Sequence, residues 1–351
     1  MALPLKIPFA PMEALSVDVI PEGDDWQYEP KWDGFRCLVF RDGDDVYLQS
    51  KSGQPLARYF PELVDIFSRL PARTFILDGE IAVPVEGRFS FDALLQRIHP
   101  AESRIRKLAA ITPALFVAFD LLAENSTRSM AAEPLRVRRA ALESFVARHF
   151  KQESLHLSPA TTRIAQARRW LEKAGGDLDG IIAKRLDLEY RSGDRSGMQK
   201  VKNHRSADCV IGGFRYAEKT VGGTRVVGSL LLGLYDDDDL LHHVGFCSGL
   251  KANERMELTE RLEKLIEAPG FTGQAPGGPS RWSTKRSSEW QPLKPRLVVE
   301  VSYDHFTGGR FRHGTSLLRW RPDKKPAQCR MEQIQQAGSA PLKLLRGKLA
   351  A

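Results

Sequence analysis

The chain has 351 residues, of which 42% are hydrophobic, enough for two packed domains. It contains no run of about 18 apolar residues, and its N-terminal stretch lacks the sustained apolar region of a signal peptide, so we expect neither a membrane span nor secretion. The four cysteines, Cys37, Cys209, Cys247 and Cys329, form no C-x-x-C pair, which argues against a disulfide framework and a zinc site and fits a reducing cytosol.

The positive charge is concentrated at the C-terminal end. The chain carries 52 Lys and Arg against 44 Asp and Glu, a net charge of +8, and residues 281–351 alone hold 15 basic and 5 acidic residues. The preceding residues therefore hold 37 basic and 39 acidic residues. A solvated basic tail and a polyanion-binding surface both account for this excess, and nucleic acid is the commonest polyanionic partner.

The first half of the chain alternates strand and helix patterns, which predicts a mixed α/β domain. Residues 36–50 indicate two strands joined across the turn-forming residues 42–45. Further buried strands are expected at 75–85, 114–122 and 179–185. Helices are expected at 58–70, at 134–150 with Pro134 in the first position, and at 161–173 with Ser158 as the cap and Gly175 and Gly176 as the stop.

The pattern changes near residue 204. Short strands are expected at 207–217, 228–237, 239–249 and 296–304, with an amphipathic helix at 252–267 whose apolar face holds Leu258, Leu262, Leu265 and Ile266. Several short strands around one helix favour a small barrel, and the five-stranded OB-fold is the leading candidate. The Gly- and Pro-rich residues 270–280 predict a mobile loop, and the aspartates at 236–239 predict a hairpin turn.

One stretch, EPKWDGFR at 29–36, places a lysine close to a carboxylate and a glycine. In an extended strand Lys31 and Asp33 would share a face, and Gly34 would let the chain turn tightly or approach a ligand; a charged edge strand is the plain alternative. A lysine with the ordinary pKa near 10.4 is neutral in about one molecule in a thousand near pH 7.4. Burial or nearby cations would lower that pKa and make Lys31 a nucleophile.

Several polar side chains interrupt otherwise apolar strands. A buried charge without a partner costs several kcal/mol, so we interpret these residues as parts of one shared polar site. They are Asp78, Glu80, Asp120, Asp179, Lys184, Lys200 and Lys202.

The order of motifs resembles that of the covalent nucleotidyltransferases, and most closely the ATP-dependent DNA ligases. KWDGFR, SKSGQ, LDGEIAV, FVAFDLL, DGIIAKR, MQKVK and RWRPDKKP follow one another from about residue 11 to 326. Phrases outside these motifs, such as RYFPEL and SLLLGLY, resemble the stand-alone bacterial LigC type. The resemblance implies an α+β nucleotidyltransferase (adenylation) domain, residues 1–203, followed by an OB-fold β-barrel domain, residues 204–351, with a basic C-terminal region.

The resemblance also implies a role for each matched residue. Lys31 is the nucleophile that attacks the α-phosphorus of ATP, assisted by Asp33 and by Lys200 and Lys202, which would point at the α-phosphate and lower the pKa of Lys31. Mg²⁺ or Mn²⁺ and basic residues would neutralise the leaving pyrophosphate. The metal-holding carboxylates are expected to be Asp33, Glu80 and Asp179. The nucleotide-binding residues are expected to be Glu29, Lys31, Arg36, Lys51, Glu80, Phe119, Lys184, Lys200, Lys202, Arg321 and Lys324.

Within that set, Phe119 would stack on adenine, Glu80 would bind the ribose or position metal, and Arg36 would reach the ribose and later the substrate. Each has a simpler alternative: Phe119 as a core residue, Glu80 as half of a structural ion pair, and the two lysines of MQKVK as a strand edge that blocks sheet pairing. Their joint occurrence with Lys31 favours the catalytic interpretation.

The last motif, with Arg319, Arg321, Asp323 and Lys324, matches the family's R-x-D-K signature, which is thought to contact the departing pyrophosphate when the barrel swings over the first domain. A basic DNA-binding strand is the compatible alternative. The swing requires a hinge, which we expect at residues 202–208.

Three positions depart from the family pattern. Asp179 stands where glutamate is common, Lys51 stands where arginine often follows serine, and Met198 stands where many relatives have tryptophan. Lysine lacks the bidentate reach of arginine towards phosphate, so affinity could differ while activity is still expected.

The leading hypothesis is a DNA ligase that seals nicks through a lysyl-AMP intermediate in DNA repair. The alternatives are an RNA ligase or capping-type nucleotidyltransferase, and a non-catalytic nucleic-acid-binding module. We expect a cytoplasmic bacterial monomer that binds nicked or gapped duplex DNA mainly through phosphates, with a steep salt dependence. A primase-polymerase repair enzyme is the partner that the resemblance implies.

Overall fold

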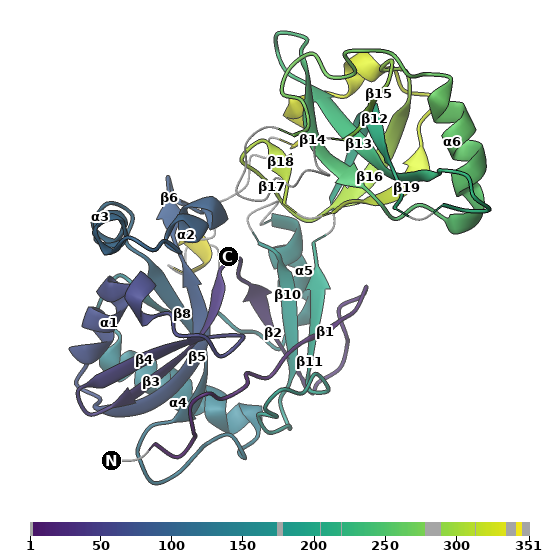
Figure 1. The fold of residues 1–351 in the computed structure, drawn as a ribbon. Helices are drawn as coiled ribbons and strands as arrows, with labels where there is room; N and C mark the ends of the chain where they lie inside the picture. The colour runs from purple at the N-terminus through teal and green to yellow at the C-terminus, as the bar shows by residue number, and fades with distance from the viewer. Residues whose placement is uncertain are drawn as a thin grey trace. The chain divides into compact units, whose positions relative to one another are not determined.

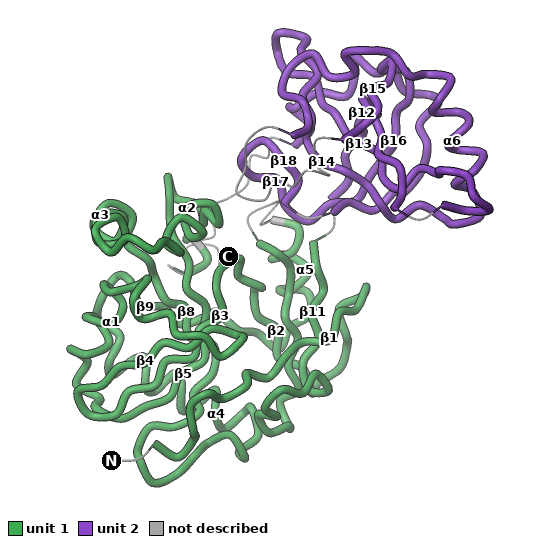
Figure 2. Tube along the Cα trace, viewed as in Figure 1, with its two compact units in different colours: residues 1–203, 338–351 green, residues 204–337 purple. Residues whose placement is uncertain are grey.

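The computed structural model describes residues 3–173, 178–203, 205–218, 220–277, 289–312, 314–334 and 342–345. The chain divides into two compact units (Figure 2). The first comprises Met1–Asn203 together with Gly338–Ala351, and the second comprises His204–Ala337. None of the helices in the described ranges is long and apolar enough to span a membrane.

The apolar strands of the first unit form a five-stranded sheet (Figure 1). Its order is β4 (Asp45–Ser50), β3 (Phe35–Asp42), β5 (Thr74–Ala82), β8 (Leu115–Ala123) and β9 (Leu155–Leu157). The predicted turn at 42–45 is confirmed, because β3 and β4 pair up to Asp42 opposite Asp45. Side chains of helices α1 (Pro61–Ser68) and α4 (Leu135–His149) pack with this sheet into one core.

A second, four-stranded sheet completes the main body of the first unit. Its order is β1 (Leu15–Ser16), β11 (Met198–Lys202), β10 (Gly180–Arg185) and β2 (Trp26–Lys31). Helix α5 (Ile164–Lys173) packs against β2 and β10. The remaining elements of the first unit are β6 (Pro84–Val85), β7 (Arg88–Phe89), α2 (Phe91–Gln96), α3 (Glu102–Ile111) and the 3-10 helix η1 (Ala57–Tyr59).

The predicted helices of the first unit exist, with different ends. Pro61 rather than Arg58 begins α1, and Pro134 is the N-cap of α4 with ψ 151, not its first helical residue. Ser158 does not cap α5; its hydroxyl accepts from the Trp32 indole instead. The proposed stop at Gly175 and Gly176 lies outside the described residues.

The second unit is an OB-fold barrel, as predicted. Its sheet order is β14 (Leu241–Cys247), β13 (Val227–Tyr235), β12 (Arg205–Tyr216), β16 (Val298–Tyr303) and β19 (Ser316–Trp320). A parallel bridge between Cys247 and Thr315 connects the two ends of this order and so closes the barrel. The minor elements are β15 (Gln291–Pro292), β17 (Phe306–Thr307), β18 (Arg310–Phe311), η2 (Ala252–Glu254), η4 (Pro326–Gln328) and η5 (Met331–Ile334).

Two expectations for the second unit were wrong in part. The helix at 252–267 is a 3-10 turn followed by α6 (Arg255–Glu263), and Ile266 beyond it is exposed and bridges to Leu293. The described part of the loop at 270–280 is held in place, because Phe271 is buried over Gly212 and the carbonyl of Gln274 accepts from His243 at 2.8 Å. The hairpin at 236–239 is confirmed by the Asp236 to Leu240 hydrogen bond.

The C-terminal end groups with the first unit, whereas we expected the second domain to run to residue 351. Helix α7 (Leu342–Leu345) contributes three leucines to an apolar cluster around Trp170 and Leu178, and Leu344 is buried there. Burial of these leucines accounts for the grouping. Of the predicted hinge at 202–208, β11 contains Lys202 and β12 begins at Arg205.

Candidate active site

A cavity of about 780 Å³ in the first unit is lined by residues of both sheets and by the N-terminal segment 11–14. Strands β2, β3, β5, β8, β10 and β11 all contribute to its wall. Eight of the eleven predicted nucleotide-binding residues line this cavity: Glu29, Lys31, Arg36, Lys51, Glu80, Phe119, Lys184 and Lys200. The topology therefore collects side chains from segments as far apart as residues 29 and 200.

Lys31 is the last residue of β2 and faces a position that only glycine can occupy. Gly180 of β10 lies between Lys31 and Lys202 in the pairing register, with φ +142, and a Cβ there would lie 2.0 Å from the carbonyl oxygen of Val201. Side chains directly opposite in a sheet share a face, so this rung brings Lys31 and Lys202 to the same face with no side chain between them. The carboxylate of Asp179, next to Gly180, accepts a hydrogen bond from the Lys31 ammonium.

The surroundings of Lys31 favour its neutral form. Burial lowers the pKa of Lys31 to about 8, with Lys202 and Lys200 adding to the decrease and Glu80 and Asp33 opposing it. Lys200 and Lys202 are two apart on β11 and so share a face, as the sequence predicted. A pKa near 8 leaves a substantial fraction of Lys31 neutral at physiological pH, which an attacking amine requires.

Asp33 is close enough to Lys31 to raise its pKa, but the strand alternation that we expected does not bring the two side chains together. Strand β2 ends at Lys31, and Asp33 lies in the connection to β3, so strand alternation does not align the two side chains. Gly34 in the same connection is required by packing, because a Cβ there would lie 2.2 Å from the carbonyl oxygen of Ile81. The glycine lets the chain approach β5, and it also lines the cavity.

Glu80 lines the cavity on β5, opposite Arg36 of β3. Burial raises the pKa of Glu80 to about 7, an increase that Arg36 and Lys31 oppose and that Asp33 and Asp78 reinforce. Within the described residues no group of three His, Cys, Asp or Glu side chains is placed to hold a metal ion. A divalent cation beside Glu80 would stabilise its ionised form, and carboxylate oxygens such as those of Glu80 and Asp33 are ligands that Mg²⁺ prefers.

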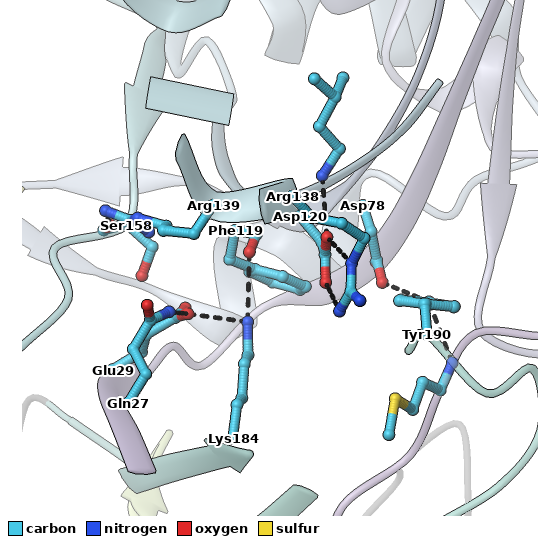
Figure 3. A network of polar contacts seen from close by, with 12 residues as sticks. Gln27, Glu29, Asp78, Phe119, Asp120, Arg138, Arg139, Ser158, Lys184 and Tyr190 are labelled. Carbon is cyan, nitrogen blue, oxygen red and sulfur yellow. Dashed lines mark hydrogen bonds and ion pairs between the residues drawn. The ribbon is translucent and has the colours of Figure 1, made fainter. Parts of the chain in front are cut away.

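Glu29 and Lys184 form a buried ion pair beside the aromatic ring of Phe119 (Figure 3). The Lys184 ammonium lies 2.8 Å from the Glu29 carboxylate, donates to the Phe119 carbonyl at 3.2 Å, and lies 4.7 Å from the Phe119 ring centroid. Gln27 donates a further hydrogen bond to Glu29 at 2.8 Å. The pair thus satisfies both charges inside the wall of the cavity and fixes the position of Phe119.

Arg36 is held by a network that the sequence did not predict in full. Its Nε and Nη2 donate to the two oxygens of Asp78 at 2.6 Å each, and its guanidinium lies 4.6 Å from the Phe119 ring centroid. The Tyr190 hydroxyl donates to Asp78 at 2.5 Å and accepts from the Met12 backbone at 2.9 Å. Burial alone would lower the pKa of Arg36, but Asp78 raises it overall, so the guanidinium is always charged.

Asp120 does not join the cavity, so the interpretation of one shared polar site was wrong for this residue. Its carboxylate pairs with Arg138 of α4, with Nε and Nη2 at 2.8 and 3.0 Å from its two oxygens (Figure 3). Arg138 also donates to the carbonyls of Glu133 and Leu188. This buried pair joins α4 to β8 and is structural.

A second cluster of charge lies at the cavity wall near Lys51. Glu13 of the N-terminal segment accepts from Lys51 at 3.1 Å and from Arg195 at 2.9 Å. Burial would raise the pKa of Glu13, but the two cations lower it overall. Burial, Lys202, Lys51 and Arg195 lower the pKa of Lys200. These cations form a positive surface that is partly neutralised by Glu13.

The last motif lies on the second unit, as its sequence position implies. Arg321 Nη1 and Lys324 Nζ both contact Asp208, at 2.8 and 2.6 Å from its two oxygens. Asp323 accepts from Arg321 as well, and Arg319 pairs with Glu300 at 2.6 Å.

The sequence analysis missed several residues of these networks, among them Glu13, Tyr190, Arg195 and Asp208. Each lies far along the chain from its partners, by 112 residues for Tyr190 and Asp78. Tyr190 has no local sequence pattern that marks it as part of a network. A polar residue within the buried first strand of the barrel, ADCVIGG, was the signal available for Asp208.

Comparison with known proteins gives the same family for both units. Residues 11–202 match the model of the ATP dependent DNA ligase domain, and residues 223–324 match that of the ATP dependent DNA ligase C terminal region. DNA ligase C1 of Mycolicibacterium smegmatis is 46% identical over 345 residues, which cover 95% of this chain and 96% of that protein.

Two further likenesses are more distant. A multifunctional non-homologous end joining DNA repair protein of Mycobacterium tuberculosis, LigD, is 33% identical over 307 residues, which cover 86% of this chain and 37% of that protein. A solved structure from a study of Lig E DNA ligases, 15% identical with a TM-score of 0.52, covers 90% of this chain and 100% of that one and shows the shared fold. The family matches over both units and the near full-length identity place the chain in the ATP-dependent DNA ligase family.

Proposed function

We propose that this protein seals nicks in duplex DNA through a covalent adenylate on Lys31. The neutral amine of Lys31 attacks the α-phosphorus of ATP, a phosphorus–nitrogen bond forms, and the bond to pyrophosphate breaks. AMP then passes to the 5′-phosphate at the nick, and the 3′-hydroxyl attacks that phosphate and releases AMP. Membership of the ATP-dependent DNA ligase family supports this assignment.

The observation that carries the proposal is the position and charge of Lys31. It lies in the wall of the cavity, with a pKa of about 8, beside carboxylates and two further lysines. A module that only binds nucleic acid gains nothing from a buried lysine with a lowered pKa, because a charged lysine binds phosphate better. The environment therefore supports nucleophilic catalysis over simple binding.

The other cavity residues are assigned by chemistry. Lys200 and Lys202 would contact the α-phosphate, Phe119 would stack on adenine, and Arg36, fixed by Asp78, would contact the ribose and later the DNA phosphate. Glu29 and Lys184 would support Phe119 from behind the base site. Asp33, Glu80 and Asp179 would hold Mg²⁺ or Mn²⁺ together with phosphate oxygens. When bound, the cation neutralises charge on the leaving pyrophosphate.

We also propose the biological setting, from the similarity to known proteins and from the charge of the chain. Similarity to an end-joining DNA repair protein supports a role in repair. A primase-polymerase enzyme as partner stays a prediction from the sequence resemblance. The excess of basic residues in the last fifth of the chain supports duplex DNA as the substrate, held mainly through phosphates. A monomer in the bacterial cytoplasm stays a prediction.

Intact mass spectrometry after incubation with ATP and Mg²⁺ tests the proposal. We expect a mass gain equal to AMP in the wild-type protein, none with GTP, and none in Lys31→Ala with ATP. Lys107→Ala, which changes an exposed lysine of α3, is the matched control and should gain AMP normally.

Sealing assays then separate the nucleic-acid classes. We expect the adenylated protein to join a nicked DNA duplex faster than a nicked RNA duplex. Absence of an adduct in the wild-type protein would overturn the covalent mechanism, and preferential joining of RNA would replace the DNA assignment with that of an RNA ligase.

A further inference from the structure

Asp208 of β12 connects the two cations of the last motif. One oxygen of its carboxylate lies 2.8 Å from Arg321 Nη1, and the other lies 2.6 Å from Lys324 Nζ. Its side chain is only 12% exposed. A carboxylate that uses both oxygens for two different cations fixes the separation of those cations.

The backbone of Asp208 is fixed independently of its side chain. The Gln333 side chain accepts from the Asp208 amide at 2.9 Å and donates to the Asp208 carbonyl at 2.9 Å. β12 also pairs with β16 here, with Asp208 opposite Glu300. The backbone that carries this carboxylate is therefore fixed, and the two cations, which follow β19 in the sequence, both contact it.

The two cations keep hydrogen-bond donors for a ligand. An ammonium has three N–H groups and a guanidinium has five. Lys324 donates one to Asp208, while Arg321 donates Nη1–H to Asp208 and its Nε–H and one Nη2–H to Asp323. The two remaining N–H groups of Lys324 and the remaining Nη2–H of Arg321 can contact phosphate oxygens without breaking the pair with Asp208, while Arg321 Nη1 also lies 3.8 Å from Glu300.

We propose that Asp208 is a positioning residue for the adenylation step, which holds Arg321 and Lys324 at the separation needed to bind the pyrophosphate of ATP. This inference rests on the proposed function, because it assigns a purpose to those two cations in that reaction. Asp208 itself does not touch the substrate. Its effect is confined to the step that forms or consumes pyrophosphate.

The confinement to one step makes the inference testable. Removing the charge of Asp208 while keeping its shape, in Asp208→Asn, leaves one amide oxygen for two cations and places an amide N–H against the other. We expect the rate of lysyl-AMP formation to fall about tenfold, the loss typical of one hydrogen bond to a charged group. The reverse reaction, in which pyrophosphate removes AMP from the adenylated protein, should slow by a similar factor because it passes through the same transition state.

Single-turnover sealing of a nicked duplex that already carries a 5′-adenylate provides the internal reference. This reaction involves no pyrophosphate, so Asp208→Asn should seal at the wild-type rate within about twofold. Asp208→Glu should recover part of the adenylation rate. Asp239→Asn is the matched control, because Asp239 is also an aspartate of the second unit paired with an arginine, Arg330, and should change neither reaction.

Three results would overturn the inference. Adenylation of Asp208→Asn at the wild-type rate would show that the cations need no organiser. A parallel loss in adenylation and in sealing of the 5′-adenylated nick would show that Asp208 only stabilises the barrel. Faster adenylation would show that Asp208 competes with pyrophosphate for the cations. Formation of lysyl-AMP by the wild-type protein tests the proposed function separately. Failure of that function can therefore be told apart from failure of the inference about Asp208.

Discussion

Three carboxylates in this ligase each contact arginine or lysine side chains, and they differ in burial. Asp78, which holds Arg36 in the first unit, is 0% exposed. Asp208, which holds Arg321 and Lys324 in the second unit, is 12% exposed. Glu13, which contacts Lys51 and Arg195, is 25% exposed.

The difference in burial distinguishes the permanent ion pair of Asp78 and Arg36 from the more exposed pairs, which can exchange partners. A buried carboxylate with two short bonds to one guanidinium cannot exchange its partner without leaving a charge in an apolar surrounding. Exposed pairs are worth little and exchange readily with water and phosphate. We infer that Arg36 is preorganised before any ligand arrives, whereas the cations near Glu13 can exchange their carboxylate for a phosphate.

The largest effect is expected from breaking the buried pair. Asp78→Ala leaves Arg36 charged with its main acceptor gone, and it removes the acceptor of the Tyr190 hydroxyl as well. Breaking a buried ion pair costs about 3–5 kcal/mol of unfolding free energy. Urea unfolding at neutral pH measures this loss. Asp208→Ala is the comparison and should lose clearly less; equal losses would remove the distinction between the two sites.

A pH profile tests whether burial also controls the nucleophile. Lys31 must be neutral to attack, and its pKa is about 8, so the rate of lysyl-AMP formation should rise about tenfold per pH unit below pH 8 and level off above it. Quenched-flow mass spectrometry at saturating ATP measures this profile. Because Lys200 helps to lower this pKa, Lys200→Gln should move the plateau to higher pH. Lys107→Gln should not, and a profile still rising steeply at about pH 10 would show an unperturbed lysine.

The sequence identified more of the residues that line the cavity than of the residues that hold them in place. Lys31 stood out beside Asp33, and Glu80 stood out as a charge in an apolar strand, whereas Phe119 was assigned only through the family resemblance. Strands β12, β13, β14 and β16 were predictable from their short apolar sequences, and they favoured the OB-fold. Asp120 was assigned to the site wrongly, because a carboxylate in an apolar strand has the same local pattern whether it faces a cavity or an arginine such as Arg138.

Pairings between distant segments account for what was missed. Tyr190 reaches Asp78 and Met12 only because the chain returns across the sheet, and Glu13 meets Arg195 across 182 residues. Helices α2 and α3 were not predicted, because their sequences are short or weakly periodic. The packing of α7 on the first unit depends on a partner surface around Trp170 that the local sequence of the C-terminal end cannot specify.

A smaller effect is expected from a change that weakens the buried pair of Arg36 and Asp78 without breaking it. Tyr190→Phe removes one hydrogen bond to Asp78 and one from Met12, while Arg36 keeps both of its bonds to Asp78. We expect a loss of about 1–2 kcal/mol in unfolding free energy and a higher KM for ATP with a smaller change in kcat, since segment 11–14 lines the cavity. Adenylation kinetics measure both constants. Tyr47→Phe is the control, and a change in kcat alone would show that Tyr190 acts on the chemical step.

The smallest effect, of opposite sign, is expected at the most exposed carboxylate. Glu13→Gln removes the negative charge between Lys51 and Arg195, so both cations should bind a DNA phosphate more readily. Fluorescence anisotropy should show about two- to threefold tighter binding of a nicked duplex near 50 mM salt, approximately the value of one exposed ion pair. The gain should fade near about 500 mM salt, where screening is strong.

The matched control for Glu13 is Glu22→Gln, which removes an exposed glutamate paired with Arg168 and should leave binding unchanged. Weaker binding in Glu13→Gln would mean that Glu13 orients Lys51 and Arg195 for phosphate, as Asp208 is proposed to orient its two cations. The exposed pair would then be a positioning device too, and burial would no longer distinguish preorganised cations from exchangeable ones. Tighter binding that persists at high salt would point to a change in shape rather than in charge, because a purely electrostatic gain is lost as counterions accumulate.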